Sequence, residues 1–481
     1  MGTNTSQPMD AQGEVDGRPV TWFYQRAEQG QVGRLSWAEG RVPSPNTEWS
    51  HISTDHIIAV FPARSQGASQ YQVLYVSDSD TNGDTKASPI AFRTLATSNP
   101  PQQVIHDFQP PGQACLYTRM SQPGPGSNFH VIVSTASGTG QAVDVWKQLV
   151  RPFLEFVSAD NVEQKFEMHF TTSETTISDL TRSVFLPRAN AGVSQSIVLL
   201  SGDGGLVDIA NTLLSEPHTQ TYQKPNVAIL PLGTGNAMAN SSGVTKDKTL
   251  GASTLIRGSP KDVPLFRARF SPGARLLVNE AREERELTSH SNSPICHGAV
   301  VCSWGLHAGL VADSDTAHYR QFGAERFQMA AKEALYPSDG SLPHPYRGKL
   351  SVLRPASNTW QPIDRMEHAY VLATLVSHLE AGFHISPASK PLDGKLRLLH
   401  FGPMSGEEAM ALMTRAYQDG KHVDDPRVGY EEIAGLRIEF DEEDARWRRV
   451  CVDGKIIRVE QGGWMEVKNG AGEGLVDLIA M

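Results

Sequence analysis

The segment between Phe129 and about residue 240 alternates short apolar runs, small-residue loops and amphipathic stretches. The apolar runs are FHVIV, SIVLL and VAILPL, and each precedes a loop rich in Gly, Ser and Thr. After the first loop, Ala142, Val145 and Leu149 recur at the spacing of one helical face. Repeated alternation of strand, loop and helix is typical of a parallel sheet with crossover helices. The sequence therefore predicts an α/β unit here.

Three loops place glycine between a strand and a helix, at residues 134–140, 201–205 and 231–236. A helix that starts there exposes unpaired backbone N–H groups, and glycine lets the backbone approach a phosphate closely. For any single loop the alternative is an ordinary connector, but the three together predict one polyphosphate crevice. The chain has neither G-x-x-x-x-G-K-[ST] nor the full G-x-G-x-x-G fingerprint, which disfavours P-loop NTPases and NAD dehydrogenases.

Asp203 lies inside the second of these loops. A carboxylate repels phosphate unless it binds Mg²⁺ or takes a proton from an attacking hydroxyl. The alternative interpretation is a turn residue, because Asp is also common in turns. The first interpretation makes Asp203 a candidate catalytic residue.

Longer motifs resemble the diacylglycerol kinase catalytic domain, in the version found in sphingosine kinases. They are SIVLLSGDGGLVDIAN, VAILPLGTGNAMANS, SWGLHAGLVADSDTAHYRQFGAERF, SPASKPLDGKLRLLH and CVDGK, and they follow the family order from about residue 129 to 467. The resemblance implies a Rossmann-like α/β nucleotide-binding domain of the NAD kinase and diacylglycerol kinase type, followed by a C-terminal β-sandwich lipid-binding domain. It also implies a lipid kinase that uses ATP and Mg²⁺ and phosphorylates a hydroxyl of a sphingoid base, ceramide or diacylglycerol.

The resemblance assigns roles by position. Asp203 is the expected catalytic carboxylate, and Ser201 and Asp313 are the expected substrate-binding residues. Two extra residues between Trp304 and Tyr319 make Gly309 an alternative match to Asp313. No residue is assigned to a metal. The expected nucleotide-binding residues are Ser134, Thr135, Ser137, Gly138, Thr171, Gly202, Gly204, Asp208, Gly233, Thr234, Gly235, Asn236, Arg320, Arg326, Asp453 and Gly454.

The chain departs from the family pattern at two places. Ser134 and Thr135 replace an Asn-Pro pair, and Lys455 stands where the family has a glutamate. Losing a carboxylate matters because phosphoryl transfer depends on positioning and charge neutralisation. One alternative is therefore a non-catalytic nucleotide or lipid binder of the same fold. The other is a soluble-substrate kinase similar to NAD kinase.

Changes in composition and hydrophobic pattern along the chain predict four segments. Residues 1–50 are expected to be a flexible lead-in, and residues 51–125 a small β-rich segment that either targets a membrane or completes a later sheet. The α/β nucleotide-binding domain is expected over residues 126–263. Strand-like runs punctuated by turn signals predict a β-rich lipid-binding domain over residues 264–481, with one helix near Glu325–Leu335.

Composition limits the partners. The formal net charge is −10 without a long basic run, which disfavours a nucleic-acid partner. No apolar stretch approaches the roughly 18 residues of a membrane span, and the polar start lacks the apolar run of a secretory signal. We expect a cytoplasmic protein that contacts a membrane peripherally. The start MGTNTS fits N-myristoylation at Gly2, the four cysteines are expected to be reduced thiols, and the oligomeric state is left open.

Overall fold

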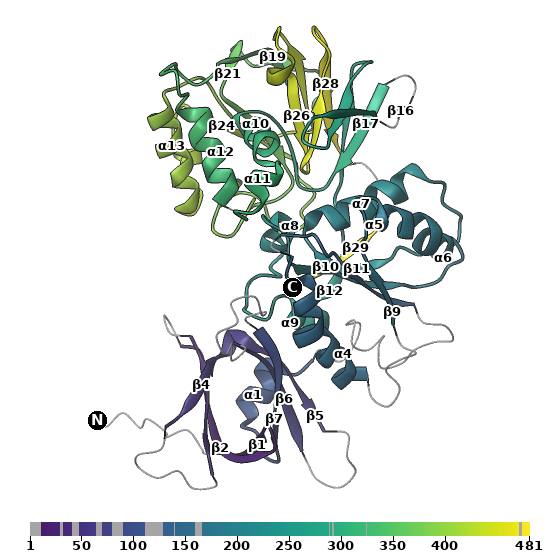
Figure 1. Ribbon diagram of the computed structural model, residues 1–481, viewed down its shortest axis with the longest axis vertical. Helices are drawn as coiled ribbons and strands as arrows, with labels where there is room; N and C mark the ends of the chain where they lie inside the picture. The colour runs from purple at the N-terminus through teal and green to yellow at the C-terminus, as the bar shows by residue number, and fades with distance from the viewer. Residues whose placement is uncertain are drawn as a thin grey trace.

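The computed structural model describes residues 11–28, 32–40, 48–63, 70–78, 90–110, 128–138, 140–158, 166–287, 289–290, 293–323, 325–470 and 474–481. Gly2 and Cys115 lie outside these ranges, so the predictions for them stay predictions. Figure 1 shows three units along the long axis, with a β unit at the bottom, an α/β unit in the middle and a β-rich unit at the top. No helix within the described ranges is long and apolar enough to cross a membrane.

The N-terminal unit is an antiparallel sheet with one helix, α1 (Gln102–Phe108), packed on it. Its strands follow the order β4-β3-β2-β1-β7-β6-β5. The prediction of a flexible segment over residues 1–50 is therefore wrong for the first three strands, where alternate residues such as Val20, Trp22 and Tyr24 are buried. The strands are β1 (Ala11–Val15), β2 (Arg18–Gln25), β3 (Arg34–Glu39), β4 (Ser50–Ser53), β5 (Ile57–Pro62), β6 (Tyr71–Asp78) and β7 (Ile90–Thr97).

One edge of this sheet is buried on both faces. Along β6, Val73 and Tyr75 belong to the core of the N-terminal unit, whereas Leu74 and Val76 belong to a core shared with the α/β unit. Phe92 on β7 contacts the rings of Phe153 and Phe156, with centroid distances of 6.0 and 5.9 Å. The near-continuous apolar run YQVLYV is what a strand covered on both faces requires. The N-terminal unit is thus joined to the α/β unit by an apolar interface.

The middle unit contains a mostly parallel sheet in the order β12-β29-β11-β10-β8-β9. Strands β9, β8, β10, β11 and β29 are parallel to their neighbours, and β12 is antiparallel to β29. Buried branched residues fill the central strands because helices cover both faces. The strands are β8 (Phe129–Val133), β9 (Glu167–Phe170), β10 (Ser196–Ser201), β11 (Asn226–Pro231), β12 (Ser259–Asp262) and β29 (Asp477–Ala480).

The helical segments of this unit follow the strands as the sequence pattern predicts. The helix α7 (Asp203–Ser215) begins directly after the second glycine loop, and α8 (Ala237–Ser241) begins after the third. The remaining segments are α3 (Ala142–Val145), η2 (Trp146–Val150), α4 (Arg151–Ser158), α5 (Thr176–Leu180), η4 (Thr181–Phe185), α6 (Leu186–Asn190) and α9 (Ala252–Arg257). The predicted α/β unit is therefore present. The prediction that residues 264–481 form one separate unit is wrong at the end of the chain, because β29 returns to this sheet.

The β-rich unit contains two sheets that share one hydrophobic core, which includes Phe266, Trp304, Ile438 and Met465. The first sheet contains β13 (Phe266–Phe270), β16 (Ser289–His290), β17 (Ser293–Gly298), β19 (Tyr346–Leu353), β20 (Gln361–Pro362), β21 (Glu367–His368), β25 (Gly435–Phe440) and β28 (Trp464–Asn469). The second contains β14 (Arg275–Val278), β15 (Glu283–Glu286), β18 (Val301–Gly305), β22 (Tyr370–Thr374), β23 (Arg397–Phe401), β24 (Gly429–Glu432), β26 (Arg449–Val452) and β27 (Lys455–Arg458).

Helices gather on one side of the β-rich unit (Figure 1). The predicted helix at Glu325–Leu335 is present as α12, but the prediction of one helix is incomplete. The structure adds α10 (Leu306–Ser314), α11 (Ala317–Arg320) and α13 (Gly406–Thr414), the last with a capping box at Ser405 and Glu408. Short 3₁₀ turns complete the chain: η1 (Thr54–His56), η5 (Arg415–Tyr417), η6 (Lys421–Asp424) and η7 (Ala445–Arg448).

Candidate active site

A pocket of about 770 Å³ lies between the α/β unit and the helices of the β-rich unit. One part of its lining comes from the loops after β10 and β11 and includes Asp203. The other part is largely apolar and comes from α10, α12, α13 and the loop after β22. Its apolar members include Leu306, Leu310, Val311, Phe327, Leu335, Leu379, Phe383, Met410 and Met413. One cavity therefore joins a polar glycine-rich end to an apolar slot.

Asp203 is the first residue of α7 and lines this pocket. Burial raises the pKa of its carboxyl to about 6; backbone N–H groups at the start of α8 lower it, and the charge of nearby Asp453 raises it. Its Oδ1 is buried without a hydrogen-bond partner. A carboxylate with an unused acceptor and a pKa near neutrality is suited to take a proton or to bind a cation.

The loop after β11 is held by Asn236, which adopts a left-handed conformation with φ 52°. Its Oδ1 accepts from the Gly233 N–H over 2.8 Å, and its Nδ2 donates to the Gly233 carbonyl over 2.9 Å. A Cβ on Gly233 would lie 2.5 Å from Gly202 Cα, so the two glycine loops touch through their backbones. In contrast, a Cβ on Gly204 would meet nothing within 4 Å. The loops form a rigid backbone cradle beside open space.

The first glycine loop adjoins this cradle without lining the pocket. The Ser201 hydroxyl pairs with Ser137 Oγ over 3.1 Å, and Ser137 Oγ donates to Ser134 Oγ over 3.0 Å. Thr135 N–H donates to Thr171 Oγ1 over 3.0 Å. The structure thus brings together the predicted residues of the first glycine loop, Thr171 at the end of β9 and Ser201 at the end of β10. The predicted substrate contact of Ser201 is not supported by this placement, because its side chain is buried behind the pocket.

The two predicted arginines share the Asp315 carboxylate. Arg320 donates to it through Nε and Nη2 over 2.9 and 3.0 Å, and Arg326 Nη1 lies 3.5 Å away. Arg326 and Asp315 line the pocket, and the buried Arg326 Nε has no hydrogen-bond partner. Arg320 does not line the pocket; its hydrogen bonds to Asp315, and then the charges of nearby acids, raise its pKa. Arg326 is therefore the better placed of the two to meet a pocket ligand.

Asp313 does not line the pocket in this structure, so its role as a substrate contact stays a prediction. Its carboxylate binds Arg449 over 2.7 Å and Arg446 over 3.1 Å. Val311 of the same helix lines the pocket, and two residues turn a helix by about 200°, so Asp313 lies on the opposite face. The alternative match, Gly309, carries no acid, and a Cβ there would lie 3.2 Å from the Tyr346 hydroxyl. Of the nearby acids, Asp315 reaches the pocket instead.

Asp453 and Gly454 line the pocket at the turn between β26 and β27. Asp453 has φ 48° and Gly454 has φ 85°, the left-handed conformations that a tight Asp-Gly hairpin turn requires. The Asp453 carboxylate accepts from the backbone N–H groups of Ala299 and Val301, each over 2.6 Å, and of Val300 over 3.1 Å. Burial nevertheless raises its pKa to about 6. These bonds engage both carboxylate oxygens, so Asp453 stabilises the backbone around the site.

Asp208 and Lys455 form an ion pair at the edge of the site, with Lys455 Nζ 3.0 Å from Asp208 Oδ1. Neither residue lines the pocket, although each is close in sequence to a residue that does. Asp208 was predicted to contact the nucleotide, but its carboxylate is engaged by this lysine. The ammonium group that replaces the family glutamate therefore has a definite partner, which the sequence pattern did not reveal.

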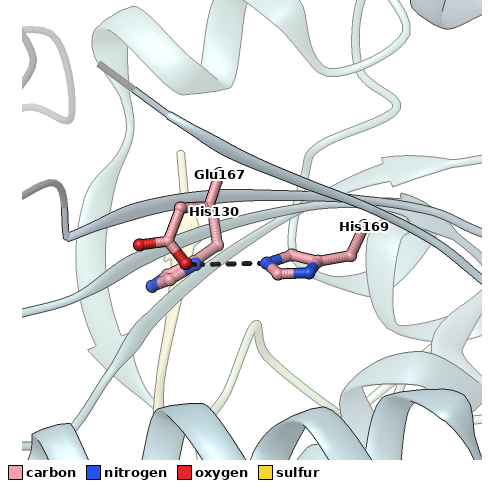
Figure 2. Close-up of side chains that lie close together, drawn as sticks. All are labelled: His130, Glu167 and His169. Carbon is pink, nitrogen blue, oxygen red and sulfur yellow. Dashed lines mark hydrogen bonds and ion pairs between the residues drawn. The ribbon is translucent and has the colours of Figure 1, made fainter. Parts of the chain in front are cut away.

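Among the described residues, His130, Glu167 and His169 have the composition of a metal site, with ligand atoms within 4.8 Å of one another. Figure 2 shows them at the β8–β9 edge, and His130 Nδ1 lies 3.4 Å from His169 Nε2. However, Arg188 lies 2.9 Å from His130 Nε2 and donates to Glu167 over 2.8 Å. A metal on Nδ1 would require a proton on Nε2, which would then face the arginine donors. We therefore interpret the cluster as a hydrogen-bonded network.

Two polar residues of the apolar slot escaped prediction from the sequence. His307 and Tyr370 line the pocket, and their rings lie 6.0 Å apart. The sequence signal for His307 is one polar residue in the apolar stretch LHAGLV. Tyr370 begins a buried strand and gives no separate signal.

Part of this chain matches known proteins in sequence. Residues 128–268 match the diacylglycerol kinase catalytic domain family. Sphingosine kinase 1 of Mus musculus is 24% identical over 341 residues, which cover 64% of this chain and 81% of that protein. Sphingosine kinase 2 of Homo sapiens is 30% identical over 176 residues, which cover 34% of this chain and 23% of that protein.

Among solved structures, a diacylglycerol kinase from Bacillus anthracis str. Sterne is similar with a TM-score of 0.44 and 14% identity. The similarity covers 74% of this chain and 98% of that one. The sequence matches confirm the resemblance read from the motifs. Residues 128–268 are thus similar to the diacylglycerol kinase catalytic domain, and 64% of the chain is similar to sphingosine kinase 1.

Proposed function

We propose that this protein is an ATP-dependent lipid kinase that transfers the γ-phosphoryl group of ATP to a lipid hydroxyl. The observation that carries the proposal is the continuity of the pocket. Asp203 and the glycine loops line the same cavity as the apolar side chains of α10, α12 and α13. A lipid lying in the slot would present its head group to the loops, where a nucleotide phosphate can be bound by backbone N–H groups.

In the proposed reaction, the lipid hydroxyl oxygen bonds to the γ-phosphorus while the bond from that phosphorus to the β–γ bridging oxygen breaks and ADP leaves. Asp203 accepts the hydroxyl proton. Its raised pKa, about 6, leaves it ionised at neutral pH yet basic enough to take that proton. Arg326, beside the pocket, places positive charge near the transferring group.

Ten of the sixteen expected nucleotide-binding residues form two groups. Gly202, Gly204, Gly233, Thr234 and Gly235 line the pocket and are the proposed phosphate cradle. Ser134, Thr135, Ser137, Gly138 and Thr171 lie at the neighbouring strand ends and are proposed to bind the rest of the nucleotide. Mg²⁺, when bound, would neutralise phosphate charge, and Asp203 fits it because its Oδ1 has no protein partner.

We propose the α/β unit, residues 126–263 completed by β29, as the nucleotide domain. The unit from residue 264 to β28 is proposed as the lipid domain. The apolar lining favours a lipid over NAD, the acceptor in the soluble-substrate alternative, because NAD is highly charged. We expect the protein to take its acceptor lipid while in peripheral contact with a membrane.

An assay of phosphate transfer from labelled ATP distinguishes the proposed kinase from a non-catalytic binder of the same fold. Wild type and Asp203→Asn are compared on sphingosine, ceramide, diacylglycerol and NAD. The proposal predicts a lipid product with wild type and none with the variant. NAD phosphorylation without a lipid product would contradict it, as would nucleotide binding without any transfer.

A further inference from the structure

The apolar slot contains two hydrogen-bonding groups that the protein itself does not satisfy. His307 is 9% exposed and Tyr370 is 2% exposed, and both line the pocket. His307 Nδ1 pairs with Ser303 Oγ over 2.7 Å, whereas its Nε2 and the Tyr370 hydroxyl make no hydrogen bond to another described residue and are open to the cavity. Two hydrogen-bonding groups left open in a largely apolar cavity are available to a polar atom of a ligand.

Both side chains are held firmly in place. The Leu306 N–H donates to the Ala369 carbonyl over 2.8 Å, which fixes the start of α10 against the start of β22. The Tyr370 ring stacks on Phe401 with a centroid distance of 5.2 Å and an angle of 9°. His307 lies in the first turn of α10. The two unsatisfied groups therefore belong to packed elements rather than to a loop.

Both groups can donate to a ligand oxygen. Burial lowers the pKa of His307 to about 4, so the ring is neutral and carries one N–H. When Nδ1 accepts from the Ser303 hydroxyl, that proton lies on Nε2, which is then a donor. Burial also raises the pKa of Tyr370, so its hydroxyl keeps its proton.

We propose that His307 and Tyr370 form a subsite that binds an acceptor oxygen on the lipid backbone, distinct from the hydroxyl that is phosphorylated. Two neutral donors, the Nε2–H and the tyrosine O–H, suit a carbonyl of an acyl linkage or a second hydroxyl. The inference deepens the proposed function, because it takes a lipid as the occupant of the slot.

The test is equilibrium binding without ATP, so that it does not depend on phosphate transfer. The probes are dioleoylglycerol, its matched dioleyl ether without carbonyls, and sphingosine, each presented in phosphatidylcholine vesicles. The proteins are the full chain and its His307→Leu, Tyr370→Phe and Val311→Ala variants, with thermal unfolding as the check of folding. Val311 lines the same slot without a polar group and serves as the control.

If a carbonyl is bound, His307→Leu and Tyr370→Phe weaken dioleoylglycerol binding about two- to tenfold, the value of one hydrogen bond, and leave the ether unchanged. If a hydroxyl is bound, the same variants weaken sphingosine binding and treat the ester and ether alike. Val311→Ala weakens all three probes. If His307→Leu and Tyr370→Phe are folded and bind all three lipids as tightly as the wild type, the inference is wrong, and the two groups are hydrated rather than bonded to lipid.

The same experiment separates this inference from the proposed function. Carbonyl- or hydroxyl-dependent binding by a protein that transfers no phosphate would support the subsite and contradict the kinase. Failure of the wild type to bind any of the three lipids would overturn both.

Discussion

The Lys455 ammonium group donates to Asp208 Oδ1 over 3.0 Å and so ties β27 of the β-rich unit to α7 of the α/β unit. Both side chains are partly buried, and Asp208 raises the pKa of the lysine against the opposing effect of burial. The pair lies beside Gly204 and Gly454, which line the pocket. A residue that departs from the family pattern thus has a clear structural role at the junction of the two units.

Lys455→Met should destabilise the protein, because Asp208 is left without its partner. The expected loss lies between about 1 kcal/mol, typical of an exposed pair, and about 3 kcal/mol, the lower value for a buried one. Urea unfolding of Lys455→Met, Asp208→Asn and the double variant measures the coupling between the two residues. Additive effects would contradict the pairing.

Lys455→Glu should be destabilised further, because the new carboxylate lies near Asp208 and Asp453. A divalent cation bound between these acids would restore part of the loss. We therefore expect Mg²⁺ to raise the unfolding temperature of this variant more than that of the wild type. An equal response of both proteins to Mg²⁺ would argue against an acidic cluster at this position.

The raised pKa of Asp203 should give both activity and stability a distinctive pH dependence. Because its pKa rises from about 3.8 unfolded to about 6 folded, the folded protein holds the extra proton between these values. Its contribution to stability therefore falls as pH rises through this window, whereas phosphate transfer rises toward neutrality as the carboxylate ionises.

Asp203→Asn supplies the control for this prediction. The variant should abolish transfer, yet at pH 7 it should be at least as stable as the wild type. Chemical unfolding between pH 4 and 7 measures the difference in stability. A variant that becomes less stable than wild type as pH rises would show that the charged carboxylate is stabilising, contrary to this account.

Asp453→Ala should destabilise the fold rather than only weaken nucleotide binding. The substitution leaves the backbone N–H groups of Ala299, Val300 and Val301 without an acceptor, and each unsatisfied buried group costs about 1–3 kcal/mol. Urea unfolding should show a loss of roughly 3 kcal/mol or more. Unchanged stability with weakened nucleotide binding would assign Asp453 to the ligand alone.

Phe92→Ala, a change in the N-terminal unit, should destabilise α4 of the α/β unit, because the Phe92 ring packs against Phe153 and Phe156 of that helix. Amide hydrogen exchange in α4 should become faster, reflecting a loss of up to about 3 kcal/mol. Phe23→Ala is the matched control, since Phe23 contacts Trp49 within the N-terminal unit. Equal exchange in α4 for both variants would contradict a coupled interface.

Local pattern predicted much of the α/β unit and its glycine loops. The strand ends at Ser201 and Pro231 and the helix start at Asp203 follow directly from periodicity and loop chemistry. The helix Glu325–Leu335 was also found from its spacing. These features depend on residues close in sequence, which is why they could be predicted from it.

What the sequence did not reveal depends on distant partners. Strand β29 pairs with β11, about 250 residues earlier in the chain, and no local pattern encodes that choice. The strands around Trp22 were missed because the polar, Gly-containing stretches on both sides of RPVTWFYQ obscured the strand signal of that run. Whether Asp313 or Asp315 lines the pocket depends on how α10 packs against its neighbours, which the local sequence does not encode.

The most direct test of the account is product identification after incubation with ATP, Mg²⁺ and a mixed panel of sphingosine, ceramide and diacylglycerol. Mass spectrometry should find one of these lipids with a phosphate on its hydroxyl after incubation with the wild type, and no such product with Asp203→Asn. A folded wild-type protein that binds ATP and lipid yet forms no phosphorylated lipid would contradict the central claim.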